Sequence, residues 1–241
     1  MRIAILSDIH GNRTAFEAVL ADLRKTSPDI ILHGGDLADT GSSPAYVLDY
    51  IRDLGWQGVM GNTDEMLVEP DTLDAFARQS AAPSTIWNSV REIAEATRSS
   101  LGEDRLSWLR DLPKIHTSAL FALVHATPES CWQVPSSKAT DAELTGVYGS
   151  LHQPIVVYAH THQPSVRKLS SSNLLLINTG SVGLPYDGDL RASYLLLDEN
   201  VPTLRRVEYD IDKELRALSS SNLPHTGWVV RILRTATPQL P

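Results

Sequence analysis

Short apolar runs alternate with helical patterns over the first third of the chain. The pattern predicts strands at residues 2–6, 30–32 and 57–60, and helices at residues 12–25 and 44–54. In the first of these helices, Ala15, Val19 and Leu23 recur at the spacing of one helical face. Strands that alternate with helices indicate βαβ units, so we expect a parallel sheet in this part of the chain.

The middle of the chain, from about residue 71 to residue 112, has a different pattern. It contains few β-branched runs, and residues 90–101 and 104–109 favour helices, with a break at Pro83. This stretch therefore predicts an all-helical insertion between two strands of a sheet.

The rest of the chain returns to strand patterns. The pattern predicts strands at residues 119–124, 155–158, 174–177, 193–197 and 203–209. The last three follow one another without room for helices, so we expect them to pair antiparallel, as a meander or as hairpins. No linker is long enough to separate two domains, which predicts a single α/β domain over residues 1–241 with one helical insertion.

Composition and charge exclude several classes of protein. Hydrophobic residues make up 42% of the chain and charged residues 21%, which is typical of a globular protein. Cys131 has no second cysteine to form an internal disulfide, and no apolar run approaches a signal-peptide core or a membrane span. The net charge of −8, without a Lys/Arg block, argues against binding to nucleic acid or to an anionic membrane. We therefore expect a cytoplasmic protein.

Polar side chains with metal-ligand chemistry follow five of the predicted strands. They are Asp8, His10, Asp36, Asn62, His125, His160 and His162. A lone histidine at a strand end is more often structural, but here every candidate has the same position relative to a strand. The carboxyl ends of strands in an open α/β sheet form a binding crevice. Seven ligands exceed the need of one ion and would suit two divalent ions bridged by a carboxylate. Imidazole and carboxylate ligands fit Zn, Fe, Mn or Ni.

These residues also carry a family resemblance. Asp8-x-His10, Gly35-Asp36, Gly61-Asn62-x-Asp64, His125 and Ala159-His160-Thr161-His162 resemble the signature of the calcineurin-like metallophosphoesterases. The closer similarity is to the small bacterial and archaeal branch of phosphodiesterase and diadenosine-tetraphosphatase-like proteins. The resemblance implies a four-layer α/β/β/α sandwich of two mixed sheets. It implies one ion on Asp8, His10 and His162, another on Asn62, His125 and His160, and Asp36 as the bridge.

Two positions depart from the family signature. Ala159 stands where a glycine is usual, and Thr63 stands where the full signature has a histidine that assists the leaving oxygen. A threonine hydroxyl can donate a hydrogen bond but cannot act as a general acid near neutral pH. We expect in-line attack by a hydroxide that bridges the ions, with Asp36, Asn62 and Thr63 at the reacting centre. Thr63 favours nucleotide-like diesters or phosphoanhydrides over alkyl monoesters.

Other residues have weaker indications. Asn12 could contact a phosphate or could cap the helix that follows it, and Arg191 could hold a phosphate or lie on the surface. Asp39 and Asp64 are candidates to orient ligand imidazoles, although we expect Asp64 to be solvated. His33 is expected to be structural.

Two alternatives to an enzyme remain open. Thr63 would suit a protein-interaction scaffold, since a retromer coat subunit of this fold lacks the same histidine. A scaffold, however, would not need all seven ligand positions filled. The other alternative is a nucleotide-binding module with little or no catalysis. Apolar residues near the end, such as Trp228 and Ile232, could pack on the body of the protein or form a homo-oligomer.

Overall fold

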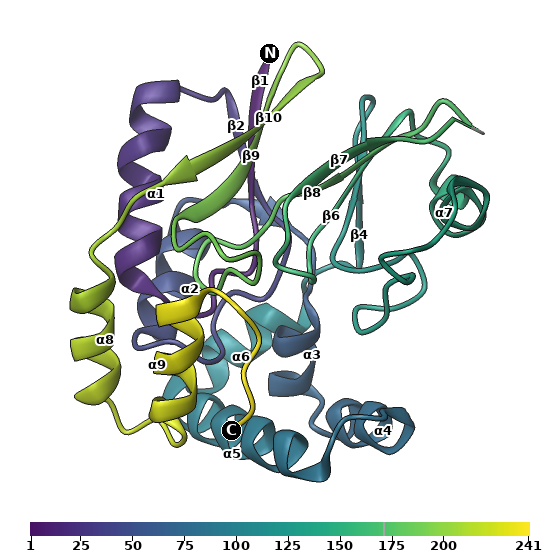
Figure 1. Ribbon diagram of the computed structural model, residues 1–241. Coiled ribbons are helices and arrows are strands. Elements are labelled where there is room, and N and C mark those ends of the chain that lie inside the picture. The colour runs from purple at the N-terminus through teal and green to yellow at the C-terminus, as the bar shows by residue number, and fades with distance from the viewer. Residues whose placement is uncertain (171) are drawn as a thin grey trace.

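The computed structural model describes residues 1–170 and 172–241 and contains two mixed sheets (Figure 1). The first sheet contains, in spatial order, β10 (Val201–Val207), β9 (Ala192–Asp198), β1 (Arg2–Leu6), β2 (Ile30–His33) and β3 (Gln57–Gly58). Strands β1, β2 and β3 run parallel, as the alternating pattern predicts, and β9 and β10 form an antiparallel hairpin beside β1.

The second sheet comes mainly from the second half of the chain. It contains, in spatial order, β4 (Ile115–Thr117), β5 (Ala122–Val124), β6 (Ile155–Tyr158), β8 (Leu175–Asn178) and β7 (Ser165–Lys168). Strands β5, β6 and β8 are parallel, and the edge strands β4 and β7 are antiparallel to their neighbours.

Both faces of each sheet are covered. Successive side chains of a strand point to opposite faces, one packed against the other sheet and one against helices. Ile3 and Ile5 of β1 point between the sheets and pack with Leu123 and Val157 of the second sheet. The other face of the first sheet is covered by α1 (Arg13–Thr26) and α2 (Pro44–Asp53). The other face of the second sheet is covered by α7 (Asp141–Tyr148), which ends in a 3₁₀ turn at Gly149–Leu151. The expected α/β/β/α architecture is confirmed.

The helical insertion is also confirmed. Between β3 and β4 the chain forms α3 (Asn62–Val68), α4 (Asp71–Gln79), α5 (Ser84–Leu101) and α6 (Glu103–Arg110). Helix α5 buries Ile93, Ala94, Thr97 and Leu101, which recur along one side of the helix. Ala94 and Leu101 belong to the main core cluster, and Ile93 belongs to a second cluster with residues of the chain end.

Two helices follow the last strand, where the sequence indicated only a packing segment. They are α8 (Ile211–Ser219) and α9 (Thr226–Thr235). Val229, Ile232 and Leu233 of α9 are buried in one cluster with Ile93 of α5 and Leu184. The end of the chain therefore lies beside the helical insertion, although the two are far apart in the sequence (Figure 1).

The expected pairing of the last three strands is wrong for one of them. Strands β9 and β10 form the predicted hairpin, but β8 lies in the second sheet, parallel to β6. The antiparallel partner of β8 is β7, whose four residues, Ser165–Lys168, are all exposed and mostly polar. An exposed edge strand needs no apolar face, so the hydrophobic pattern does not reveal it. Within the described residues, no helix is both long and apolar enough to span a membrane.

Candidate metal centre

Five strand ends bring the predicted ligands to one place between the sheets. Asp8 and His10 follow β1, Asp36 follows β2, and Asn62 opens α3 after β3. His125 follows β5, and His160 and His162 follow β6. Backbone hydrogen bonds join the loops, since the amides of Asp8 and His10 donate to the carbonyl oxygens of Gly35 and Asp36, each at 3.0 Å. We call these five segments the ligand loops: residues 7–12, 34–36, 61–64, 125 and 159–162.

The first group of candidate ligands is tightly clustered. One side-chain donor atom from each of Asp8, His10, Asp36 and His162 lies within 4.8 Å of the others, and all four residues are buried. Nδ1 of His10 lies 3.1 Å from the Asp39 carbonyl oxygen, and Nδ1 of His162 lies 2.5 Å from the Leu184 carbonyl oxygen. If each Nδ1 donates to its carbonyl, both Nε2 atoms present lone pairs, and they face each other at 3.3 Å. A bound cation between them would remove this repulsion, so the group fits a metal ion.

The second group is clustered around the side-chain oxygen of Asn62. Nδ1 of His125 donates to the Gly34 carbonyl oxygen at 2.7 Å, which leaves Nε2 facing Oδ1 of Asn62 at 3.0 Å. Nδ1 of His160 lies 2.8 Å from the same amide oxygen. The imidazole and amide donors that surround this point suit a borderline divalent ion.

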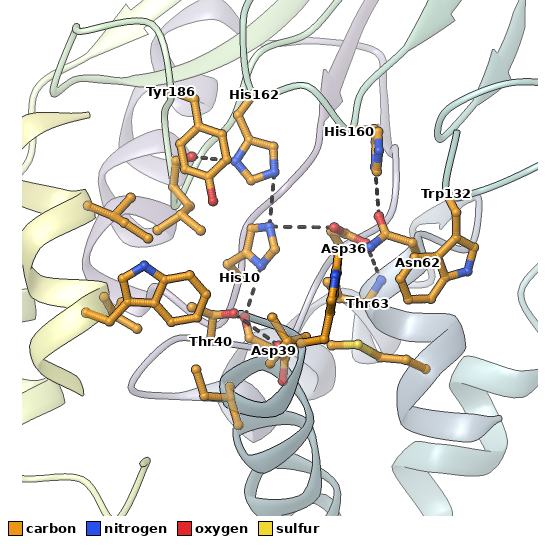
Figure 2. A pocket seen from close by; sticks show the side chains of 18 residues that line it. His10, Asp36, Asp39, Thr40, Asn62, Thr63, Trp132, His160, His162 and Tyr186 are labelled. Carbon is orange, nitrogen blue, oxygen red and sulfur yellow. Dashed lines mark hydrogen bonds and ion pairs between the residues drawn. The ribbon is translucent and has the colours of Figure 1, made fainter. Parts of the chain in front are cut away.

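Asp36 lies between the two groups (Figure 2). Its Oδ2 is 3.6 Å from Nε2 of His10, and its Oδ1 is 3.5 Å from Nε2 of His125. One carboxylate oxygen thus faces each group, which is the placement that a bridging ligand needs.

Asp64 is buried beside the candidate ligands, so the expectation that it is solvated is wrong. Its side chain is fully buried and accepts from the amides of Asp36, Leu37 and Gly61 at 2.7, 3.0 and 3.0 Å. These bonds tie the second ligand loop to the third. A Cβ atom on Gly61 would lie 2.1 Å from Oδ1 of Asp36, so only glycine permits this approach. Burial and the nearby Asp36 carboxylate raise the pKa of Asp64 to about 6.

The backbone of the ligand loops is strained. Five candidate ligands have positive φ angles between 50° and 66°: Asp8, His10, Asp36, His160 and His162. Left-handed backbone is uncommon for residues other than glycine and costs about 1–2 kcal/mol each. Such strain gathers at functional sites, where the surrounding structure enforces it.

Burial keeps two of the candidate ligands ready to bind a cation. It lowers the pKa of His10 and of His160 to about 4, so both imidazoles are neutral near pH 7. Burial also acts to lower the pKa of His162, but the Asp8 carboxylate 3.2 Å away outweighs it and raises that pKa. Burial acts to raise the pKa of Asp8, and His162 outweighs it in turn and holds that pKa well below its usual range.

A cavity of about 160 Å³ opens over the candidate ligands (Figure 2). Its far side is formed by α5 and α9, through Trp87, Val90, Ile93, Trp228, Val229 and Ile232. We call these six residues the apolar wall. Sequence reasoning missed the wall, because its two helices are recognisable only as amphipathic segments until they are packed together.

Tyr186 is a further residue that the sequence did not indicate. Its ring stacks on the His162 imidazole, with 4.4 Å between centroids and 20° between planes. It lines the cavity beside the candidate ligands (Figure 2). The stack fixes the orientation of one candidate ligand.

The remaining predicted site residues have distinct positions. Thr63 lines the cavity, and its buried hydroxyl makes no hydrogen bond within the described part of the chain. Asn12 caps α1, since its side chain accepts from the Ala15 amide and donates to the Gly183 carbonyl oxygen, both at 2.9 Å. Arg191 is exposed and pairs with Asp189 at 2.6 Å. The Asp39 contact to His10 comes from its backbone carbonyl oxygen.

Comparisons with known proteins agree with this geometry. The calcineurin-like phosphoesterase superfamily domain matches residues 1–201. An uncharacterized protein of Methanocaldococcus jannaschii is 30% identical, over 92% of this chain and 93% of that protein. The crystal structure of a metallophosphoesterase from Sphaerobacter thermophilus has a TM-score of 0.78 and 25% identity, over 98% of this chain and 99% of that one.

A more distant similarity concerns a nucleotide-cleaving enzyme. The symmetrical bis(5'-nucleosyl)-tetraphosphatase of Methylococcus capsulatus is 27% identical over 150 residues, which cover 61% of this chain and half of that protein.

Proposed function

The chain belongs to the calcineurin-like phosphoesterase superfamily, and from this premise we propose that it is a two-metal phosphoesterase. Its substrates would be small, nucleotide-like phosphodiesters or phosphoanhydrides, in line with the similarity to a bis(5'-nucleosyl)-tetraphosphatase. The observation that carries the proposal is the buried cluster of side-chain donor atoms from Asp8, His10, Asp36 and His162, which lie within 4.8 Å of one another, with His10 Nε2 and His162 Nε2 only 3.3 Å apart. Buried lone pairs that face each other call for a cation.

The proposed ligand sets follow from the two groups of side chains. One ion would be held by Asp8, His10 and His162, the other by Asn62, His125 and His160, with Asp36 shared. Two divalent ions, when bound, lower the pKa of a coordinated water for in-line attack on phosphorus and neutralise charge on the phosphoryl oxygens. The carbonyl oxygens of Asp39, Gly34 and Leu184 keep three imidazoles turned toward the centre.

Thr63 determines which leaving groups the centre can release. Its buried hydroxyl faces the cavity and can donate a hydrogen bond to a leaving oxygen. It cannot deliver a proton near neutral pH, and the loss of general acid help typically costs about 10²–10⁴ in rate. Leaving groups that depart as stable anions escape this penalty, so diesters and anhydrides of such groups are the favoured substrates.

The test is a paired assay on protein reconstituted with Mn²⁺ or Zn²⁺. Bis(4-nitrophenyl) phosphate should be hydrolysed faster than 4-nitrophenyl phosphate, and glycerol 2-phosphate should be slowest. Asp36→Asn should reduce the diesterase activity by more than about 100-fold, because even residues outside the ligand set of a metal site contribute 10–100-fold. It should also lower the number of bound metal ions measured by elemental analysis.

Three outcomes would contradict parts of this proposal. An Asp36→Asn protein that retains two ions and full activity would exclude the bridging role. Turnover of glycerol 2-phosphate as fast as that of 4-nitrophenyl phosphate would overturn the role given to Thr63, as would a Thr63→His variant with no gain on glycerol 2-phosphate. No turnover of any substrate with two ions bound would favour a binding module instead.

A further inference from the structure

The cavity over the candidate metal centre has two chemically different sides. One side carries the imidazoles, Asp36 and Asn62 (Figure 2), and the apolar wall completes the lining. Ile93, Val229 and Ile232 of the wall are at most 3% exposed, so this side is part of the packed interior. A phosphoryl group on the ions would place the rest of the substrate against hydrocarbon and indole surface.

The described lining of the cavity adds no cationic Lys or Arg side chain to the proposed ions. No lysine or arginine is found among the described residues that line it, whereas Asp36 and Asp39 do line it. The carboxylates of Asp8 and Asp36 would already neutralise half of the charge that two divalent ions bring. A polyphosphate chain carries several negative charges, and burying them without paired cations is costly. The charge distribution therefore suits a single phosphoryl group.

The size of the cavity limits the group that can lie against the apolar wall. Its volume of about 160 Å³ is close to the ~150 Å³ of an apolar protein cavity that binds one benzene molecule. Because the phosphoryl group shares this volume, a single aromatic ring is the largest group that the cavity would take beside it. Phenols also leave as comparatively stable anions, which matches the inability of Thr63 to supply a proton.

We propose that this site is selective for phosphodiesters whose leaving group is a single uncharged aromatic ring, and that it discriminates against polyphosphates. This inference rests on the proposed function and narrows its substrates from phosphodiesters and phosphoanhydrides to the phosphodiesters, since it assigns the leaving group of the same reaction. Trp87 and Val90 of α5 and Trp228 of α9 are then specificity-determining residues. The second ester group would extend out of the cavity, where a nucleoside remains acceptable.

The first experiment measures binding without turnover. Phenylphosphonate, methylphosphonate and pyrophosphate are titrated into the metal-loaded protein by calorimetry. Phenylphosphonate should bind about 10- to 100-fold more tightly than methylphosphonate, which is the effect of burying one aromatic ring. Its binding should also show the more negative heat-capacity change. Equal affinity of the two phosphonates would overturn the inference.

The second experiment changes the charge of the wall. Val90 is only partly buried on α5, so Val90→Lys can keep its ammonium group near solvent. Val90→Lys should weaken the preference for phenylphosphonate and strengthen pyrophosphate binding, while the uncharged Val90→Met should keep the wild-type order. If Val90→Lys does not fold, Trp228→Lys tests the same wall from α9. A lysine in the apolar wall that leaves the relative affinities for phenylphosphonate and pyrophosphate unchanged would contradict the inference.

A third measurement separates this inference from the proposed function. Wild-type protein is assayed on thymidine 5'-(4-nitrophenyl) phosphate and on diadenosine tetraphosphate. We expect the aryl diester to be favoured in kcat/KM by at least about 10-fold, the smaller estimate for the ring. If both are hydrolysed and the tetraphosphate is favoured, the inference is wrong and the proposed function stands. If neither is hydrolysed with two ions bound, the proposed function fails, and the phosphonate titration still decides whether the wall selects a ring.

Discussion

The ligand loops and the apolar wall face each other across one cavity but are built on different principles. The ligand loops are short segments at the ends of strands that backbone hydrogen bonds join, and the segments 7–12, 34–36 and 159–162 contain residues with positive φ angles. The apolar wall has no such local geometry. It exists because α5 of the insertion and α9 of the chain end bury apolar sides in one cluster.

This difference separates chemistry from selectivity. Under the proposed function, the ligand loops determine which bond is cleaved, and small displacements there would disturb the ions. The wall determines which group can accompany the phosphoryl group, and side chains on helix surfaces can be exchanged with little effect on the loops. Substitutions in the two regions should therefore have different effects. Those in the ligand loops should cause loss of metal, and those in the apolar wall should alter the preference among ligands.

Apart from the proposed ligands themselves, the largest effect is expected at Asp64, the last residue of the third ligand loop. An asparagine there offers one acceptor oxygen, so at least one of the three amides it now binds, that of Leu37, would face an NH₂ group. Metal affinity should fall about 10- to 100-fold. The metal-free protein should lose about 1–3 kcal/mol of stability, the cost of an unpaired buried donor. Competition with a chelator and urea unfolding measure these effects. Asp212→Asn, at an exposed position, is the matched control. Equal losses in both variants would show that Asp64 does not support the metal site.

A second effect concerns the pH dependence of stability and His33, a buried histidine outside the candidate ligands. His33, at the end of β2, is fully buried, and neither ring nitrogen has a hydrogen-bond partner in the described structure. Burial, with a smaller effect of His116, lowers its pKa to about 3. The unfolded chain, with a histidine pKa near 6.5, therefore binds more protons in acid. The stability that His33 contributes is complete above about pH 6.5 and is lost as the pH falls toward 3.

The comparison of wild type with His33→Leu isolates the pH-dependent stability that His33 contributes. Between pH 7 and pH 5, the metal-free wild type should lose about 2 kcal/mol more stability than the variant, since the other histidines cancel in the difference. Urea unfolding at the two pH values provides the measurement. Parallel losses in the two proteins would show that His33 is not a buried neutral imidazole.

The ligand loops could be predicted because their signals are local. A strand that ends in Asp8-Ile9-His10 or in Gly35-Asp36 carries both its position in the sheet and its chemistry within a few residues. The family signature then assigned those residues to two ions, and the structure brings their side chains together. The same local logic predicted the first three strands and the helical character of the insertion.

The other features depend on contacts between distant segments. Asp64 looks like an ordinary helix-start carboxylate until β2 and β3 bring the Asp36 and Leu37 amides over it. Ile93 and Ile232 each read as one apolar position on an amphipathic helix, and only packing makes them neighbours. Strand β7 is polar and exposed, so its pairing with β8 leaves no hydrophobic trace.

Tyr186 should produce a smaller effect that belongs to the ligand loops despite its aromatic character. Its ring stacks on His162, and aromatic pairs contribute about 0.5–1.5 kcal/mol beyond burial. Tyr186→Leu should weaken metal binding about 2- to 10-fold, while Tyr186→Phe keeps the stack and should stay within about twofold of wild type. Metal competition titrations distinguish the two variants. A Phe variant as weak as the Leu variant would transfer the role from the ring to the hydroxyl.

The smallest effect is expected at Arg191, and it tests the premise that the cavity has no cation of its own. The guanidinium is exposed and held by Asp189 at 2.6 Å, and such exposed pairs contribute about 0–1 kcal/mol. Arg191→Ala should therefore leave kcat/KM on bis(4-nitrophenyl) phosphate within about twofold. A rise in KM above tenfold, reduced by added salt, would mean that Arg191 reaches the substrate during turnover. The charge argument against polyphosphates would then lose its basis, although the apolar wall would still favour an aromatic ring.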